Sequence, residues 1–181
     1  TANADRVLTL MGEFGADTGR YANHHPWTAR LPRDADIGQR RSDHDMRLSV
    51  FNYPLKGWAD AVVMNLLMGL AVGVQLDELQ QVSYQPLAEV FRIIKPIEAQ
   101  HAELADKGLR TLSDHVTTAA LQSSVNYWWP RAAASFGDES SQNFDGLKTM
   151  GLRKNSNATQ KARWQQEATA ALAKHGLSPS S

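Results

Sequence analysis

The sequence predicts an all-α protein. No segment alternates apolar and polar residues over the length of a strand, whereas long stretches carry apolar residues at helical spacing. The longest apolar run, residues 61–74, falls within a predicted helix over Trp58–Gln81 that is apolar on all sides, as expected of the central helix of a bundle. At ~1.5 Å per residue the run would span roughly 21 Å, short of the ~30 Å membrane interior, so we expect a buried helix and no membrane association.

The other helices follow from the same periodicity, and we expect residues 1–181 to form a single domain with one core. The aromatic cluster Tyr127–Trp129 is expected to fill that core, because no basic patch accompanies it. In chain order, the further predicted elements are an amphipathic helix over 6–21, a connecting segment over 22–42, a helix over 84–112, a helix capped by Ser113 or Asp114 and followed by Pro130, loops or short helices over 136–157, and a last helix over 159–174 stopped by Gly176.

The composition narrows the function classes. Nineteen basic residues balance nineteen acidic ones, so no overall field favours nucleic acid or an anionic membrane. The sequence has no cysteine, which excludes disulfides, thiolate zinc sites, iron–sulfur clusters and a cysteine nucleophile within it. Any bound metal must therefore use oxygen and nitrogen ligands, and a cytoplasmic location is the expectation.

The helix predicted over 84–112 carries the only paired metal-ligand candidates. Glu98 and His101 form an E-x-x-H, and this spacing on a helix lets a carboxylate oxygen and an imidazole nitrogen reach one ion. In bundle proteins such a pair, when it points inward, supplies half of a di-iron or di-manganese site. Pro96 is expected to kink the helix just before the pair. An apolar stripe runs beside the pair and comprises Leu87, Val90, Phe91, Ile94, Ile97 and Leu104.

Small residues recur along the predicted central helix. Asn65, Gly69 and Gly73 are spaced by four and form a ridge that would let another helix approach closely. We interpret this ridge as a packing feature.

Several segments, in order and spacing, resemble the phenylacetic acid catabolic protein family, and within it the catalytic type of epoxidase subunit. They are LSVFNYPLKGWAD over 48–60, SYQP over 83–86, the E-x-x-H of Glu98 and His101, and NYWWPRAAASFGDESS over 126–141. The resemblance implies a ferritin-like helical bundle with a carboxylate-bridged di-iron centre. It also implies epoxidation of the aromatic ring of an acyl-CoA thioester, together with a reductase and a non-catalytic sister subunit. Glu98 and His101 match the second E-x-x-H of the family pattern.

Other positions depart from the ligand set that the resemblance implies. Gly15 and Thr18 stand where the first E-x-x-H is expected, and Gly69 stands where the third helix should carry a carboxylate. Glu13 and Asp17 lie near the first of these places and could contribute oxygens. The family's opening helix, which brings another Glu, has no counterpart, so we expect a bundle truncated or divergent at its N-terminal helix with an incomplete di-iron site.

Three functions remain open from the sequence. The chain is an oxygenase-family subunit that acts on an aromatic acyl-CoA, a metal-free bundle that serves as an interaction partner, or a mononuclear iron protein that uses Glu98, His101 and one of Glu13 or Asp17. A related ferritin-like subunit or a second copy is the expected partner, and no nucleic acid is expected. Candidate cations for the phosphates of a CoA ester are Arg40, Arg41, Arg47 and Lys56.

Overall fold

The computed structural model describes residues 2–22, 30–39, 47–139 and 142–179, and it is an all-α bundle of the ferritin-like kind. Within those ranges no residue belongs to a strand. The elements are α1 (Ala2–Glu13), α2 (Gly19–Ala22), the short 3₁₀ helix η1 (Ser49–Asn52), α3 (Trp58–Leu79), α4 (Gln85–Ser113), α5 (Thr118–Ala133), the 3₁₀ helix η2 (Ala134–Phe136), α6 (Phe144–Thr149) and α7 (Asn157–Ala173).

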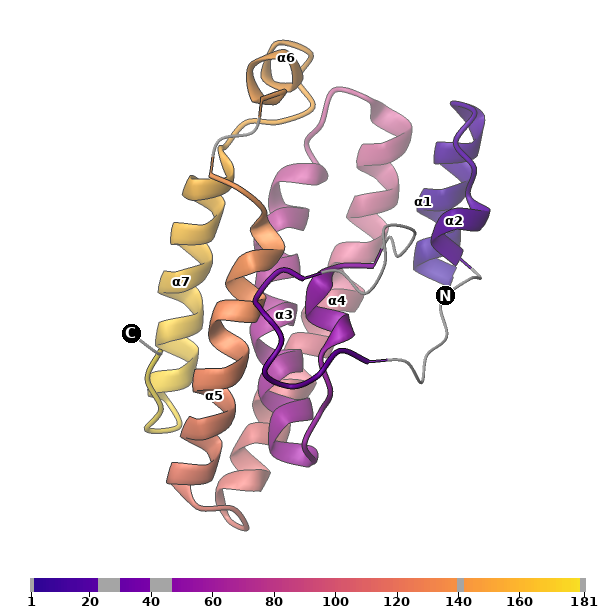
Figure 1. Ribbon diagram of the computed structural model, residues 1–181. Coiled ribbons are helices and arrows are strands. Elements are labelled where there is room, and N and C mark those ends of the chain that lie inside the picture. The colour runs from indigo at the N-terminus through magenta and orange to yellow at the C-terminus, as the bar shows by residue number, and fades with distance from the viewer. Residues whose placement is uncertain (1, 23–29, 40–46, 140–141, 180–181) are drawn as a thin grey trace.

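Helix α3 is the central element, which confirms the prediction from its apolar sequence. Figure 1 shows α3 between α4 on one side and α5 and α7 on the other, and all three helices contact it. Among the described helices, α3 alone is long and apolar enough to cross a membrane. Packing by three neighbours explains its composition without a membrane, because the core helix of a bundle must be apolar on several sides.

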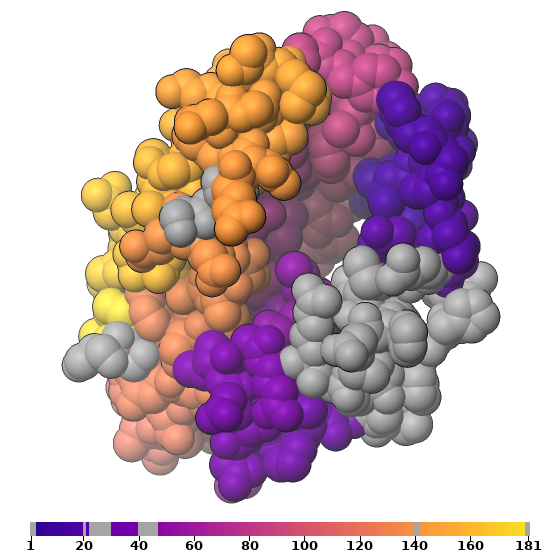
Figure 2. Space-filling view, turned by 45° about the horizontal axis from the view of Figure 1, so that its top comes forward, coloured from indigo at the N-terminus to yellow at the C-terminus, as the bar shows by residue number. Residues whose placement is uncertain are grey.

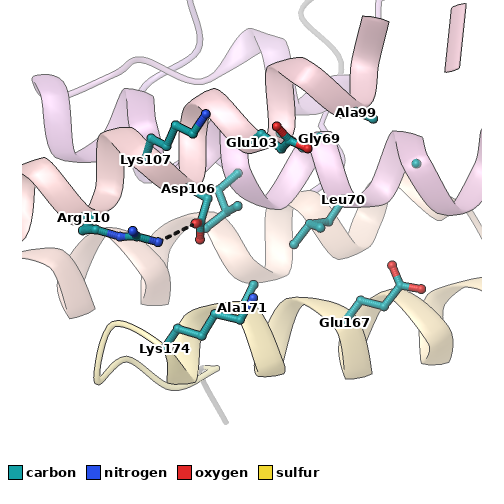
Figure 3. A pocket seen from close by; sticks show the side chains of 13 residues that line it. Gly69, Leu70, Ala99, Glu103, Asp106, Lys107, Arg110, Glu167, Ala171 and Lys174 are labelled. Carbon is teal, nitrogen blue, oxygen red and sulfur yellow. Dashed lines mark ion pairs between the residues drawn. The ribbon is translucent and has the colours of Figure 1, made fainter. Parts of the chain in front are cut away.

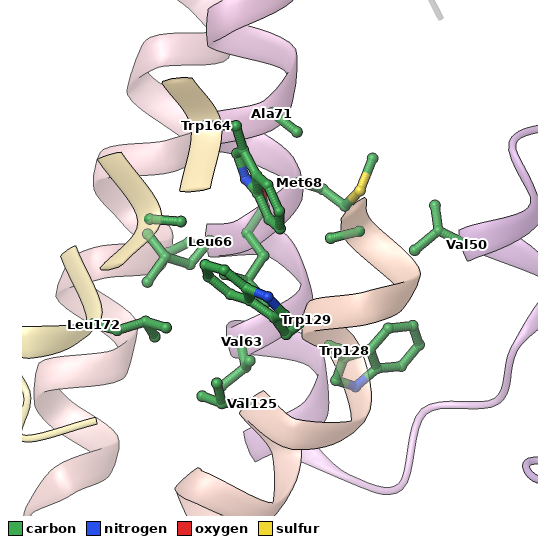
Figure 4. Packing of buried hydrophobic residues seen from close by; sticks show 14 of the residues in the cluster. Val50, Val63, Leu66, Met68, Ala71, Val125, Trp128, Trp129, Trp164 and Leu172 are labelled. Carbon is green, nitrogen blue, oxygen red and sulfur yellow. The ribbon is translucent and has the colours of Figure 1, made fainter. Parts of the chain in front are cut away.

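The core between α3, α5 and α7 is built around tryptophans (Figure 4). Trp128 and Trp164 are fully buried, and the rings of Trp129 and Trp164 lie 4.6 Å apart between centroids. The Trp164 indole N–H donates to the carbonyl oxygen of Leu67 at 3.0 Å, so this large side chain is buried without leaving its polar atom unpaired. The prediction that the tryptophans of the Tyr127–Trp129 cluster fill the core is confirmed.

Helix α4 continues through Pro96 as one helix of 29 residues. Its buried residues are Ala88, Ile94, Ala105 and Leu109. The apolar stripe predicted beside the E-x-x-H is buried only in part, because Ile97 is 36% exposed and Leu104 is 63% exposed. Of the six residues of that stripe, only Ile94 is among the buried residues of α4.

The predicted helix over 6–21 is wrong as a single element. Helix α1 ends at Glu13, and Gly15 follows with φ of +80°, a left-handed conformation that glycine adopts without a steric penalty. The chain turns there before α2 begins. Figure 2 shows α1 at the edge of the molecule against the first part of α4, where the Phe14 and Tyr84 rings meet edge to face at 5.4 Å.

Two helix boundaries also differ from the sequence prediction. Thr117 caps α5 by accepting from the backbone N–H of Ala120, whereas Ser113 is the last residue of α4 and donates to the Leu109 carbonyl. Helix α5 contains Pro130 instead of ending before it. Capping by threonine satisfies a free N–H at the first turn, and the same role falls to Ser156 at the start of α7.

Candidate functional site

Glu98 and His101 lie one turn apart on α4, as their spacing predicts. Glu98 Oε2 and His101 Nδ1 are 3.1 Å apart, so the two side chains contact one another. The His101 side chain is 60% exposed and that of Glu98 is 28% exposed. The pair therefore lies at the surface of the described structure, with a carboxylate and an imidazole close enough together to reach one ion.

The position expected to carry a third-helix carboxylate is a close helix contact. A Cβ atom at Gly69 would lie 3.0 Å from Ala102 Cβ and 3.2 Å from Ala102 Cα, and Ala102 follows His101 on α4. Backbone atoms cannot move aside as a flexible side chain can, so any larger residue would push α3 and α4 apart. The predicted packing ridge is confirmed at Gly69. At Gly73 it is wrong, because a Cβ there would meet nothing within 4 Å.

The remaining metal-ligand candidates do not join the pair on α4. Glu13 is the last residue of α1, and the Asp17 carboxylate accepts from the backbone N–H of Gly19 in the following turn; both residues are exposed. Because the helix ends between them, Glu13 and Asp17 do not share a helical face. Within the described ranges, no three His, Asp or Glu side chains gather closely enough to hold an ion.

A buried carboxylate that sequence analysis did not single out anchors another part of the molecule. Asp60, in the first turn of α3, is 2% exposed. It accepts from Arg33 at 2.5 Å, from the Lys56 backbone N–H at 2.8 Å and from the Ser124 hydroxyl at 2.8 Å. Burial alone would raise the pKa of Asp60, but these hydrogen bonds and the Arg33 charge together hold its pKa below the ordinary value of 3.8. A lone acid at the start of an apolar helix was the available signal for this role.

Two arginines and a tyrosine extend the Asp60 anchor, that is, the hydrogen bonds of Asp60 with Arg33, Lys56 and Ser124. The Arg33 and Arg131 guanidinium carbons lie 3.6 and 3.7 Å from the centre of the Tyr127 ring. The Tyr127 hydroxyl donates to the Arg33 carbonyl at 2.9 Å, and Arg131 donates to the same oxygen at 3.2 Å. The segment around Arg33 is thus tied to α3 and α5, which gives these polar residues a structural role.

A second buried carboxylate fixes the loop before α7. Glu78, near the end of α3, is 5% exposed and accepts from Arg153 at 3.0 Å and from the Asn155 backbone and side chain at 2.9 and 2.8 Å. Burial would raise the pKa of Glu78, whereas the hydrogen bonds and the Arg153 charge outweigh it and lower the pKa. Like Asp60, Glu78 uses its charge to hold segments together.

The cations considered for CoA phosphates are only partly within the described structure. Arg40 and Arg41 lie outside the described residues. Arg47 lines a hollow of about 540 Å³ that Ser49, Ser135 and Gly137 also line. Lys56 is exposed, and its backbone N–H takes part in the Asp60 anchor.

Two comparisons with known proteins match most of the chain. The profile of the family described as "Phenylacetic acid catabolic protein" matches residues 27–181. The sequence is 30% identical over 149 residues to one of the subunits of the 1,2-phenylacetyl-CoA epoxidase of Escherichia coli strain K12; the match covers 79% of this chain and 48% of that protein. The chain thus spans about half the length of this curated relative. On the extent of these matches, the chain belongs to the phenylacetic acid catabolic protein family.

Proposed function

We propose that the chain is a helical subunit of a multicomponent oxygenase related to phenylacetyl-CoA epoxidase. The observation that carries this proposal is the match to a relative that is itself one of the subunits of that epoxidase, across a region that includes α3, α4 and the Glu98–His101 pair. The proposed partners are a related ferritin-like subunit or a second copy of this chain. The proposed substrate is an aromatic acyl-CoA, and the proposed location is the cytoplasm.

The described residues do not fit a complete dinuclear iron centre. Such a centre takes about four carboxylates and two histidines, whereas this part of the chain offers Glu98 and His101, with helix packing at Gly69. We propose that Glu98 and His101 are a half-site for one iron ion, which further donors outside the described set would complete. Because the set is incomplete, we assign no oxygen chemistry to it.

The Arg47 hollow supports the acyl-CoA part of the proposal. Arg47 shares this lining with Ser49, Ser135 and the acid Asp138, and a guanidinium can bind phosphate oxygens in pairs through its planar fork of N–H donors. This hollow is lined by residues 37–38, by residues 47–49 at the start of η1, and by η2 with the two residues that follow it, away from Glu98 and His101 in the sequence.

A non-catalytic role in the bundle complex is the second candidate function. Two observations favour it: Glu98 and His101 are hydrogen-bonded to one another, and Gly69 lies in close contact with Ala102. Under this proposal the chain would contribute packing surface to a complex and would bind no iron.

Iron content separates these proposals. The chain is expressed with ample iron, alone and with a co-expressed ferritin-like sister subunit, and iron per chain is measured by atomic absorption. The half-site proposal expects about one iron per chain in the complex, lost in both Glu98→Gln and His101→Ala. Matched controls on the same helix and just beyond it, Glu89→Gln and His115→Ala, should keep the metal because both residues are exposed and neither belongs to the pair.

The other outcomes each decide a proposal. About two irons per chain, in the chain alone, would contradict the half-site. No iron in any preparation, combined with a stable complex on co-purification, would favour the non-catalytic role. Iron that survives in His101→Ala would show that the metal is held elsewhere.

A further inference from the structure

A groove between α3, α4 and α7 is separate from the Glu98–His101 pair. Its volume is about 470 Å³, within the ~300–1,000 Å³ of typical small-molecule sites, and neither Glu98 nor His101 lines it. Figure 3 shows side chains of α4 along one wall and side chains of α7 along the facing wall.

The floor of the groove is apolar and open because its side chains are short. Gly69, Gly73, Ala102 and Ala171 all line it, and Leu66 and Leu70 add larger apolar surface. A Cβ at Gly73 would find nothing within 4 Å, so the backbone of α3 is bare there. Water gains little from contact with such a surface, and the apolar body of a ligand would displace it favourably.

Most of the acids that line the groove already have a partner. The Asp106 carboxylate lies 2.9 Å from His175 Nε2 and 3.5 Å from Arg110, and Glu167 pairs with Arg163 at 2.8 Å. The hydrogen bond from His175 is the main reason that the pKa of Asp106 is lowered, so this acid stays ionised and occupied. Two of the three acids in the lining are therefore already paired.

Lys107 and Lys174 are the cations left over. Neither makes an ion pair with any described residue, although the Lys174 charge helps to lower the pKa of Asp106; Lys107 lies on α4, and Lys174 directly follows α7. Glu103 is the remaining acid, one turn before Lys107 on α4. In Figure 3, Lys107, Arg110 and Lys174 lie toward the same end as Asp106, whereas Glu167 lies toward the other end. One end of the groove thus carries three cations around one acid, Asp106, and its net charge is positive.

We propose that this groove binds a small amphiphilic carboxylate, with its aryl or short acyl body on the floor at Gly73 and its carboxylate near Lys107 and Lys174. An apolar body matches the short side chains, and the negative group matches the net positive charge of that end of the groove. The site goes beyond the proposed oxygenase role, because it uses no residue of the half-site.

Binding of phenylacetate, which has an aryl body and one carboxylate, tests the proposal by calorimetry on the whole chain. Saturable binding at one site per chain is expected, and the neutral phenylacetamide should bind at least ten-fold more weakly. Gly73→Leu should fill the groove and weaken phenylacetate binding at least ten-fold, whereas Gly146→Leu, at another helical glycine with open space, should not. The double variant K107Q/K174Q should weaken phenylacetate binding to the same extent. The control K148Q, which replaces an exposed lysine of α6, should not weaken it.

Several results would overturn the site. The site is refuted if phenylacetate binds wild type and Gly73→Leu equally, if phenylacetate and phenylacetamide bind with equal affinity, or if no saturable binding is found. A dimer in sedimentation that Gly73→Leu abolishes would instead assign the groove to a second copy. If Gly73→Leu fails to fold, the lysine double variant still decides, since both lysines are exposed. The variant H101Q should bind phenylacetate normally, so failure of the iron test and failure of this one are distinguishable.

Discussion

Asp60 and Glu98 are both helix carboxylates next to a basic group, yet they have opposite surroundings. Asp60 is buried, and its three hydrogen-bond donors come from Arg33, from Lys56 and from Ser124 on α5. Glu98 is partly exposed and contacts His101 of its own helix. The comparison teaches that the carboxylate that ties distant segments together lies at the start of α3, whereas Glu98 and His101 form a local pair at the surface.

The largest expected effect is the loss of the Asp60 charge. In Asp60→Asn, Arg33 would lose its partner; breaking a fully buried ion pair in this way costs about 3–5 kcal/mol, and because the Arg33 side chain is 33% exposed we expect a loss of about 3 kcal/mol of unfolding free energy, at the low end of that range. Urea unfolding followed by circular dichroism measures this. Asp114→Asn, at an exposed position just after α4, is the matched control and should change stability little. A loss below about 1 kcal/mol in Asp60→Asn would mean that the anchor is dispensable.

Acid should weaken the same anchor. Because the folded-state pKa of Asp60 is lowered, its contribution to stability is fully present above the ordinary value of 3.8 and is lost as the pH falls below that value through the folded-state pKa. The stability difference between wild type and Asp60→Asn should therefore be constant from pH 7 to about pH 5 and should shrink below about pH 4. Unfolding curves at several pH values measure this difference, and a constant difference down to pH 2 would refute the assignment.

An intermediate effect is expected at the crossing of α3 and α4 beneath the pair. Gly69→Ala places a methyl group 3.0 Å from Ala102 Cβ and should destabilise the chain by about 1–3 kcal/mol, although alanine favours helix more than glycine does. Gly73→Ala, one turn further on, meets open space and should stabilise by about 0.5–1 kcal/mol. Thermal unfolding of the two variants gives shifts of opposite sign; shifts of the same sign would contradict the close contact.

The smallest effect is expected at the pair itself. Glu98→Gln should change the unfolding free energy by less than about 0.5 kcal/mol, because an exposed pair is screened by solvent and contributes little. Urea unfolding of metal-free protein tests this expectation. A loss comparable to that of Asp60→Asn would show that Glu98 has a structural role and would undo the contrast between the two carboxylates.

The sequence determined the features that depend on neighbouring residues. The helical class, the central position of α3 and the one-turn spacing of Glu98 and His101 follow from periodicity within a single segment. The burial of Trp128 and Trp129, expected from the aromatic cluster, follows from their large apolar surfaces. Prediction was weaker where two local signals compete. The helix predicted over 6–21 ends at Glu13, because Gly15 allows a turn that the apolar periodicity does not reveal.

Only the tertiary structure decided what surrounds each of these residues. Asp60 takes partners 27 and 64 positions away in the chain, and Gly69 meets Ala102 across a helix crossing. The groove between α3, α4 and α7 likewise joins residues from three helices. The physical reason is that burial, close contact and charge pairing depend on distances between segments, and those distances arise from the packing of the whole bundle rather than from any one stretch of sequence.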